Sequence, residues 1–312
     1  MCGRSNAPAP SPGQRPSPSS SRPITGWDRL LPKARAIDVL AAPTLKHLRE
    51  RWWDDAFTFF LRDTVQPRAG RRILDVGCGT GTAEVRLSRL HLTQVSLVAV
   101  DLIPARVHEA LAATRSHNIR ASFAAADGCA LPFPDGTFDA AFCVAVLQHI
   151  PDVGAAVREL ARVTRPGGRI VAVEPDNGAR YFYSSVESGM RAYEASGRFF
   201  ASAAAERTDA ADGAVGPRLS TLIAGAGVEL LDVQLFPVSS ARLGAPAAAL
   251  WEGRRQAVAA AIERTRSPAT RELGSEYLAR LGEYAEAAAA AGPAFVEIQN
   301  TMLFATVGQK FE

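Results

Sequence analysis

Cysteine is scarce in this chain, and its cysteines are not spaced for pairing. The 312 residues contain four, Cys2, Cys78, Cys129 and Cys143, and no C-x-x-C motif. This spacing argues against a disulfide framework and against a zinc site, so we expect no bound metal. Free thiols are typical of a reducing compartment, and we therefore expect a cytoplasmic location.

Long apolar runs and clusters of one charge are also missing. No stretch of about 18 uncharged apolar residues exists, which argues against a transmembrane helix. The net charge is +3, and Arg4, Arg15 and Arg22 precede the first acidic residue, Asp28. The remainder is formally neutral, so we expect neither a nucleic-acid partner nor electrostatic membrane binding.

Residues 1–26 lack apolar periodicity. They are rich in proline and serine, and they contain no apolar segment of the kind found in secretory signals. Such a segment cannot bury enough surface to order itself, so we predict a disordered tail. The chain is 47% hydrophobic, enough for one large α/β domain beyond this tail.

The most informative segment is RILDVGCGTGT, residues 72–82. An apolar run predicts a buried parallel strand, which breaks at Gly77, Gly79 and Gly81 before a helical pattern over 83–90. Glycines in such a turn can adopt positive φ and leave the backbone bare for a ligand. The segment therefore predicts a small-molecule cofactor site.

The spacing of these glycines distinguishes between cofactors. The pattern is G-x-G-x-G, and Thr82 stands where the dinucleotide fingerprint G-x-G-x-x-G has its third glycine. Asp75 lies just before the first glycine, where its charge opposes a diphosphate and favours an ammonium or sulfonium group. A cationic cofactor fits this turn better than a phosphorylated one.

An acidic residue also ends the next predicted strand. Asp101 follows the apolar segment 95–100 and lies 24 residues beyond Gly77, which suits hydrogen bonding to ribose hydroxyls. Leu102 and Ile103 would then flank an adenine. The alternative is that Asp101 caps a helix over 104–114.

The fourth predicted strand, 138–146, ends close to a histidine. In open parallel sheets ligands bind outside the carboxyl ends of the strands, where Gln148 and His149 fall. An imidazole suits proton transfer near neutral pH, so His149 is a candidate general base, the alternative being a structural hydrogen-bonder. Gln148 is a candidate polar contact to cofactor or substrate. Glu174 follows a fifth strand over 170–173 at the same edge.

Two adjacent tryptophans precede the first strand, within a helical pattern over 38–65. Trp52 and Trp53 point to different faces, so they cannot both be ordinary core residues. Either one lies in the core and the other at an interface, which allows a homo-oligomer, or one closes over the cofactor or substrate.

DVGCGTG followed by acidic strand ends resembles the class I S-adenosylmethionine-dependent methyltransferases, close to their small-molecule (methyltransferase 11/25-like) branch. The resemblance covers residues 71–174. It implies a Rossmann-like α/β fold with a seven-stranded, mostly parallel sheet completed by a late hairpin. It also implies S-adenosylmethionine as the cofactor. The cofactor-binding residues are then Asp75, Gly77, Cys78, Gly79, Gly81, Asp101, Leu102, Ile103, Asp127, Gly128, Val144 and Gln148, with Asp127 reaching the adenine amino group.

Within that fold, two helical stretches lie outside the family pattern. The organisation is N-terminal helices (27–66), a cofactor-binding core (67–176), helical cap insertions (177–215 and 240–293), and a last helix and strands (216–239 and 294–312). The insertions are expected to form a lid. Tyr181 and Tyr183, predicted to be helical, would line the acceptor site together with Trp52, Trp53 and Glu174.

The resemblance implies methyl transfer to a small acceptor, and we expect a largely apolar, natural-product-like molecule methylated on oxygen, nitrogen or carbon. Two alternatives stay open at this point. One is a nicotinamide-dependent oxidoreductase, which Thr82 and Asp75 disfavour. The other is a protein that kept the fold and lost catalysis, because fold alone does not fix function.

Overall fold

A computed structural model describes residues 52–89, 95–117, 121–206 and 214–311. It contains a seven-stranded sheet in the order β3-β2-β1-β4-β5-β7-β6. The neighbours among β1 to β5 pair in parallel, and β7 runs antiparallel to β5 and β6. The predicted Rossmann-like, mostly parallel sheet is therefore confirmed. The strands are β1 (Arg72–Val76), β2 (Ser96–Asp101), β3 (Ala121–Ala125), β4 (Phe138–Val144), β5 (Thr164–Ser184), β6 (Val228–Leu243) and β7 (Val296–Lys310).

The central strands are apolar on both faces because helices cover both faces. In β1, Ile73 packs with α3 and α4 on one face, and Leu74 packs with α6 and α8 on the other.

The predicted tail, 1–26, and most of the predicted N-terminal helices lie outside the described residues. The helices are α3 (Asp55–Val65), α4 (Thr82–Ser88), α5 (Pro104–Ser116), α6 (Val153–Val163), α7 (Glu187–Ala205), α8 (Leu219–Gly225), α9 (Ala248–Glu263) and α10 (Pro268–Ala291).

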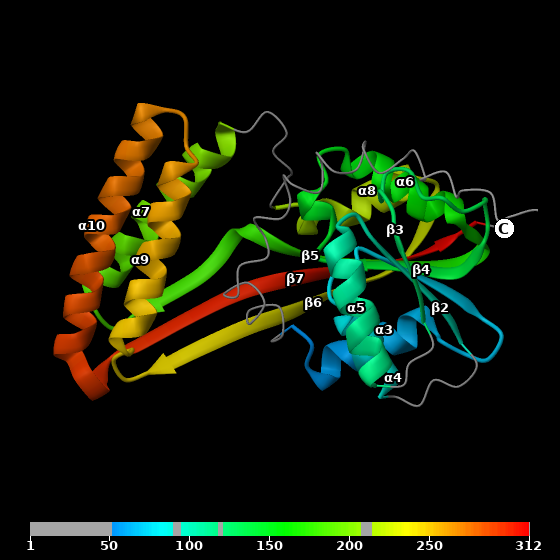
Figure 1. Ribbon diagram of the computed structural model, residues 1–312, viewed down its shortest axis with the longest axis horizontal. Coiled ribbons are helices and arrows are strands. Elements are labelled where there is room, and N and C mark those ends of the chain that lie inside the picture. Colours follow the sequence, from blue (N-terminus) through cyan, green and yellow to red (C-terminus); the bar gives the residue numbers. More distant parts are fainter. Residues whose placement is uncertain (1–51, 90–94, 118–120, 207–213, 312) are drawn as a thin grey trace, which may run out of the picture.

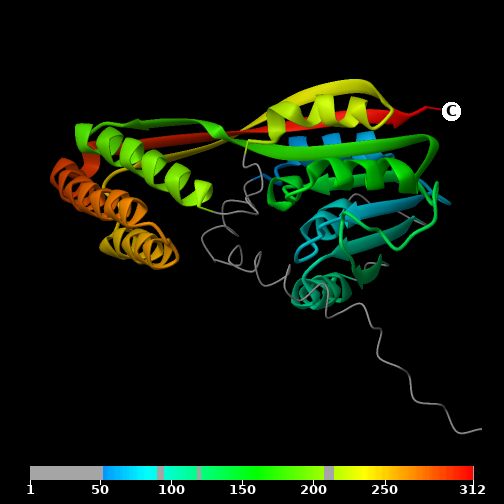
Figure 2. The same cartoon turned by 90° about the horizontal axis from the view of Figure 1, so that it is seen from above.

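The last three strands of the sheet are far longer than the others. β5, β6 and β7 contain 21, 16 and 15 residues, and they run on together beyond the edge of the core. Helices α7, α9 and α10 pack against one another at the far end of this strand extension (Figure 1). Both views place this helical group beyond the carboxyl ends of β1 to β4 (Figure 2).

The first part of the predicted insertion at 177–215 is a strand and not a helix. β5 continues to Ser184, and Tyr181 pairs with Asn300 of β7 after an irregularity in the ladder. Strand residues alternate between faces. Tyr181 and Tyr183 accordingly share one exposed face, whereas Phe182 points the other way and stacks on Tyr193 of α7, with ring centroids 4.6 Å apart. Pairing with β7, which is remote in the sequence, overrides the local pattern here.

None of the helices in the described ranges is long and apolar enough to cross a membrane.

Candidate functional site

The three glycines after β1 all adopt positive φ, at +81°, +56° and +83° for Gly77, Gly79 and Gly81. Their surroundings differ. A Cβ on Gly77 would lie 2.3 Å from Val146 Cγ2, and one on Gly81 would lie 3.1 Å from Ala110 Cα, but one on Gly79 would meet no atom within 4 Å. Gly77 and Gly81 are thus needed for packing, while Gly79 leaves bare backbone facing open space. We call residues 77–81 the glycine turn.

Asp101, the last residue of β2, is hydrogen-bonded to the glycine turn. Its two carboxylate oxygens accept hydrogen bonds from the backbone N–H groups of Gly79 and Ile103, each at 2.9 Å. The side chain is buried. The N-cap of α5 is Ile103, without a side-chain cap bond, so Asp101 is not that helix's cap. Each carboxylate oxygen retains capacity for a further bond, which a hydroxyl at this edge could donate.

A second buried acid lies beneath the glycine turn. Asp75 is the next-to-last residue of β1, and Glu84 lies fully buried in the first turn of α4. Burial raises the pKa of Asp75 well above its ordinary value, and the adjacent Glu84 raises it further. Burial also raises the pKa of Glu84, to about 7. The sequence analysis missed Glu84, although its place between Ala83 and Leu87 in an otherwise buried helix was a possible signal.

The acids around the glycine turn form no ion pair with a basic side chain in the part of the chain that the structure describes. Within the described residues, neither Asp75, Glu84 nor Asp101 forms an ion pair with arginine or lysine. Buried carboxylates are costly unless they are paired. Three acids without a counter-cation, beside bare backbone at Gly79, fit a cationic ligand and do not suit a diphosphate.

The segment that follows β4 is held by a buried glutamate. Glu174 accepts hydrogen bonds from the backbone N–H groups of Val146 and Leu147, both at 2.7 Å, and of Gln148 at 3.3 Å. Its side chain is fully buried. The predicted contact between Glu174 and a substrate stays a prediction, and the observed contacts make Glu174 a positioning residue for the loop.

Gln148 and His149 lie in the short 3-10 helix Leu147–His149 at this edge. Gln148 is buried, and its side-chain oxygen accepts a hydrogen bond from Asn177 Nδ2 at 2.9 Å. His149 is half-buried. Sequence reasoning missed Asn177, whose neighbourhood with Gln148 depends on the pairing of β4 with β5. Val144 is half-buried at the end of β4.

The predicted adenine-side residues follow β2 and β3. Ile103 is buried and Leu102 is half-buried. Asp127 lies just beyond β3, where its Oδ1 accepts a hydrogen bond from Cys129 N at 3.0 Å. A Cβ on Gly128 would lie 3.3 Å from a methyl group of Val76. The parallel pairing of β3 with β2 and of β2 with β1 therefore brings these residues to the same edge as the glycine turn.

The four aromatic residues predicted to bind substrate lie in two places. Trp53 is buried, and its ring makes an edge contact with Phe57 at 5.0 Å between centroids, while Trp52 is half-buried against the same cluster. Tyr181 and Tyr183 are 59% and 44% exposed on the strand extension. One tryptophan thus belongs to the core, and the two tyrosines present a free surface.

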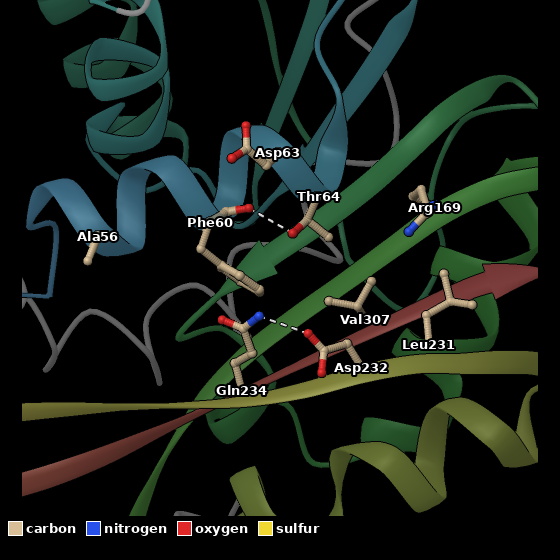
Figure 3. Close-up of a pocket in the computed structure, with 9 residues that line it drawn as sticks. All are labelled: Ala56, Phe60, Asp63, Thr64, Arg169, Leu231, Asp232, Gln234 and Val307. Atoms are coloured by element: carbon tan, nitrogen blue, oxygen red, sulfur yellow. Dashed lines mark hydrogen bonds between the residues drawn. The ribbon is translucent and has the colours of Figure 1, made fainter.

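A groove of about 680 Å³ lies elsewhere, between α3 and β6, and contains none of the predicted site residues (Figure 3). Arg169, near the start of β5, contributes to it, so the groove is at the amino ends of the parallel strands. Ligand sites in such sheets lie at the opposite, carboxyl ends. The groove is therefore separate from the candidate site at the glycine turn.

Comparison with known proteins agrees with this geometry. Residues 74–172 match the family described as methyltransferase domain. The chain is 35% identical over 106 residues to the O-methyltransferase resE of Aspergillus sclerotiorum, covering 34% of this chain and 40% of the relative. It is 31% identical over 147 residues to the 27-O-demethylrifamycin SV methyltransferase of Amycolatopsis mediterranei, covering 44% and 53%. The chain thus spans about half or less of the length of these relatives.

Among solved structures, a candidate methyltransferase of Bacillus halodurans C-125 superposes with a TM-score of 0.53 at 14% identity, covering 82% of this chain and all of the other. This likeness concerns the fold alone. The matched segment 74–172, the strand order and the glycine turn together show that this part of the chain is a methyltransferase domain of the class I, S-adenosylmethionine-dependent type.

Proposed function

We propose that this protein transfers the methyl group of S-adenosylmethionine to a small, largely apolar, natural-product-like acceptor. The observation that carries the proposal is the glycine turn, whose bare backbone at Gly79 lies near three buried acids that pair with no arginine or lysine of the described residues. A sulfonium cofactor supplies that cation. The names of the related O-methyltransferases support an acceptor from secondary metabolism.

The cofactor would be held by residues from four successive strand ends. Asp75 and the glycine turn, including Cys78, face its methionine part, and Asp101 accepts hydrogen bonds from its ribose. When bound, the cofactor supplies a methyl group already activated by the positive sulfur. The protein's residues then align the acceptor and exclude water, and such positioning can lower a barrier by about 7–11 kcal/mol. The adenine side is assigned to Leu102, Ile103, Asp127 and Gly128, and the β4 side to Val144 and Gln148.

The helical group stands opposite this edge, so we assign it and the strand extension to the acceptor side (Figure 2). Tyr181 and Tyr183, on the exposed face of the strand extension, would contact the acceptor, with the half-buried Trp52 on the N-terminal side, whereas Trp53 belongs to the core. We further propose a cytoplasmic enzyme whose partner is the small acceptor, not a nucleic acid or a membrane, and which can form homo-oligomers.

The function is tested by incubating the protein with cofactor labelled in the methyl group and with a library of apolar phenols and polyketides. Transfer is measured as label in the organic extract.

Calorimetric titration separates this function from its rivals. Binding of S-adenosylmethionine without binding of NADH is expected, because the acids at the glycine turn repel a diphosphate. Binding of NADH alone would indicate an oxidoreductase. Cofactor binding without label transfer to any acceptor would favour a catalytically silent member of the family.

Replacing Asp101 with alanine is expected to weaken cofactor binding by on the order of 2–3 kcal/mol, because two charge-assisted hydrogen bonds that shape the turn are lost along with those to the ribose. Calorimetry of the folded variant measures the effect. Asp135→Ala is the control, since Asp135 is exposed and lies before the amino end of β4, whereas the candidate site lies at the carboxyl ends of the strands. Unchanged affinity in a folded Asp101→Ala protein would remove this residue from the site.

Replacing His149 with alanine is expected to slow methyl transfer by roughly 10²-fold if the imidazole accepts the acceptor's proton. Cofactor affinity should stay within about a factor of three, because the substitution keeps the backbone N–H of His149 that donates to the Val146 carbonyl. Rates are compared across pH 6 to 9 at saturating cofactor. A normal rate in the variant would assign His149 a structural role.

A further inference from the structure

The buried acids Asp75 and Glu84 present a protonation problem that the family match does not resolve. Both side chains are almost fully excluded from solvent, at 2% and 0% exposure. With both ionised, neither oxygen of Glu84 finds a hydrogen-bond donor in the described part of the chain. A proton on either carboxyl group would supply the missing donor, and burial raises the pKa of both acids. A proton held by the pair in the free protein thus removes the cost of two adjacent buried charges.

The surroundings of the pair are apolar or acidic. Asp101 of β2 adds a negative charge, and burial together with all three acids raises the pKa of the Cys78 thiol in the turn. Cys143 of β4 is a buried thiol whose pKa is raised by burial and by nearby acids. The helices α3 and α5, which pack against α4, present apolar side chains at this place, among them Phe57, Leu61 and Ala110. Among the described residues, the charges that act on Asp75 are those of the Glu84 and Asp101 carboxylates.

We propose that the Asp75–Glu84 pair is a charge sensor, which gives up its shared proton when the sulfonium cofactor binds and regains it once the sulfur has lost its charge. This inference rests on the proposed function. The proton passes to solvent on cofactor binding, and the pair becomes doubly negative beside a positive sulfur. After methyl transfer the thioether product is uncharged at sulfur, so a solvent proton returns and the attraction between pair and ligand falls. Glu84 thereby favours the cofactor over the product and assists product release.

The test compares S-adenosylmethionine with S-adenosylhomocysteine, which share the same amino, carboxyl and ribose groups and differ in the charge at sulfur. Calorimetry at pH 6.5 in two buffers of different ionisation enthalpy counts the protons released with each ligand. We expect the charged cofactor to release between about half and one proton more than the product. We also expect its preference over the product to increase several-fold between pH 5.5 and 7.5.

Glu84→Gln is the diagnostic variant, because glutamine keeps the shape and donates a hydrogen bond to Asp75 without a titrating proton. The difference in proton release should vanish, and the pH dependence of the preference should flatten. Glu109→Gln, on the exposed face of α5, is the matched control and should behave as the wild type.

A second readout needs no ligand. Because the pKa of Glu84 in the folded protein is about 7, above its ordinary 4.5, the folded state holds a proton that the unfolded chain lacks between these pH values. Stability should therefore fall as pH rises through this window in the wild type, and fall less in Glu84→Gln. Equal proton release by both ligands, or a variant identical to wild type in both readouts, would overturn the inference. Failure of both ligands to bind would instead count against the proposed function.

Discussion

Replacing Glu297 with alanine is expected to destabilise the helical group by about 3–5 kcal/mol, the largest effect of any single substitution considered. Glu297 lies buried near the start of β7. Its carboxylate accepts hydrogen bonds from Arg254 of α9, at 2.7 and 3.0 Å, and from the Tyr284 hydroxyl of α10 at 2.8 Å. Arg242 of β6 adds a bond at 3.0 Å. Alanine would leave the Arg254 charge and the Tyr284 hydroxyl in a largely apolar cluster without their acceptor.

The pH dependence of this contribution follows from the charge of Glu297. Burial alone would raise its pKa, but the hydrogen bonds and charge of Arg254 hold the pKa below the ordinary value. A lowered folded-state pKa means that the contribution is complete above the unfolded pKa of about 4.5 and is lost as pH falls through the folded value.

Urea unfolding at pH 7 and at pH 4, followed by tryptophan fluorescence, measures both effects. Trp251, whose ring lies 4.8 Å from the Arg254 guanidinium, reports on the helical group directly. Glu283→Ala removes an exposed ion pair with Arg280 and should cost about 0–1 kcal/mol. A loss of similar size in both variants would show that the Glu297 network does not hold α9 and α10 to the strands.

Alanine at two glycines of the turn should produce opposite defects. Gly77→Ala is expected to destabilise the fold by several kcal/mol, because the new methyl group would meet Val146 at 2.3 Å and the residue has φ of +81°. Gly79→Ala should fold with a loss near 1 kcal/mol, since its Cβ meets nothing within 4 Å, yet it places a methyl group where the ligand would approach. We expect its cofactor affinity to fall at least 100-fold.

Melting temperature and calorimetric affinity, measured on both variants, separate the two roles. Gly70→Ala is a suitable control, because Gly70 also has positive φ and open space around its Cβ but lies before β1, away from the turn. It should lose stability to the same degree as Gly79→Ala and bind cofactor normally. If Gly79→Ala also bound cofactor normally, the ligand would not lie against this part of the turn.

The candidate site could be predicted largely from local patterns. Asp75, the glycine turn and Asp101 each follow an apolar strand segment, and parallel strands bring their carboxyl ends to one edge whatever lies between them. The predicted segments correspond to β1, β2, β4, α4 and α5 with ends that shift by a few residues, whereas β5 runs well beyond its predicted span, 170–173. Glu84 and Asn177 were missed because the sequence around each of them does not indicate a contact with Asp75 or with Gln148.

The region after Glu174 was the least predictable. Considered alone, the aromatic run Tyr181 to Tyr183 favoured a helix. In the structure it is a strand, because it pairs with β7, which lies more than 100 residues further along the chain. The same pairing sends Phe182 toward the helical group and both tyrosines to the free face. Strand formation depends on such remote partners more than helix formation does.

By itself, the sequence determined the sheet's parallel core, the glycine turn and the preference of that turn for a positive ligand, because these depend on short apolar runs, on glycine's access to positive φ and on the charge next to it. The tertiary structure alone decided the length of the strand extension and where the helical group stands. It also decided that Glu84 joins Asp75 and that Glu174 holds the loop of Gln148 and His149. These arrangements join residues that lie from 9 to more than 100 positions apart in the sequence. The burial that shifts the pKa of the acids exists only when the chain is folded.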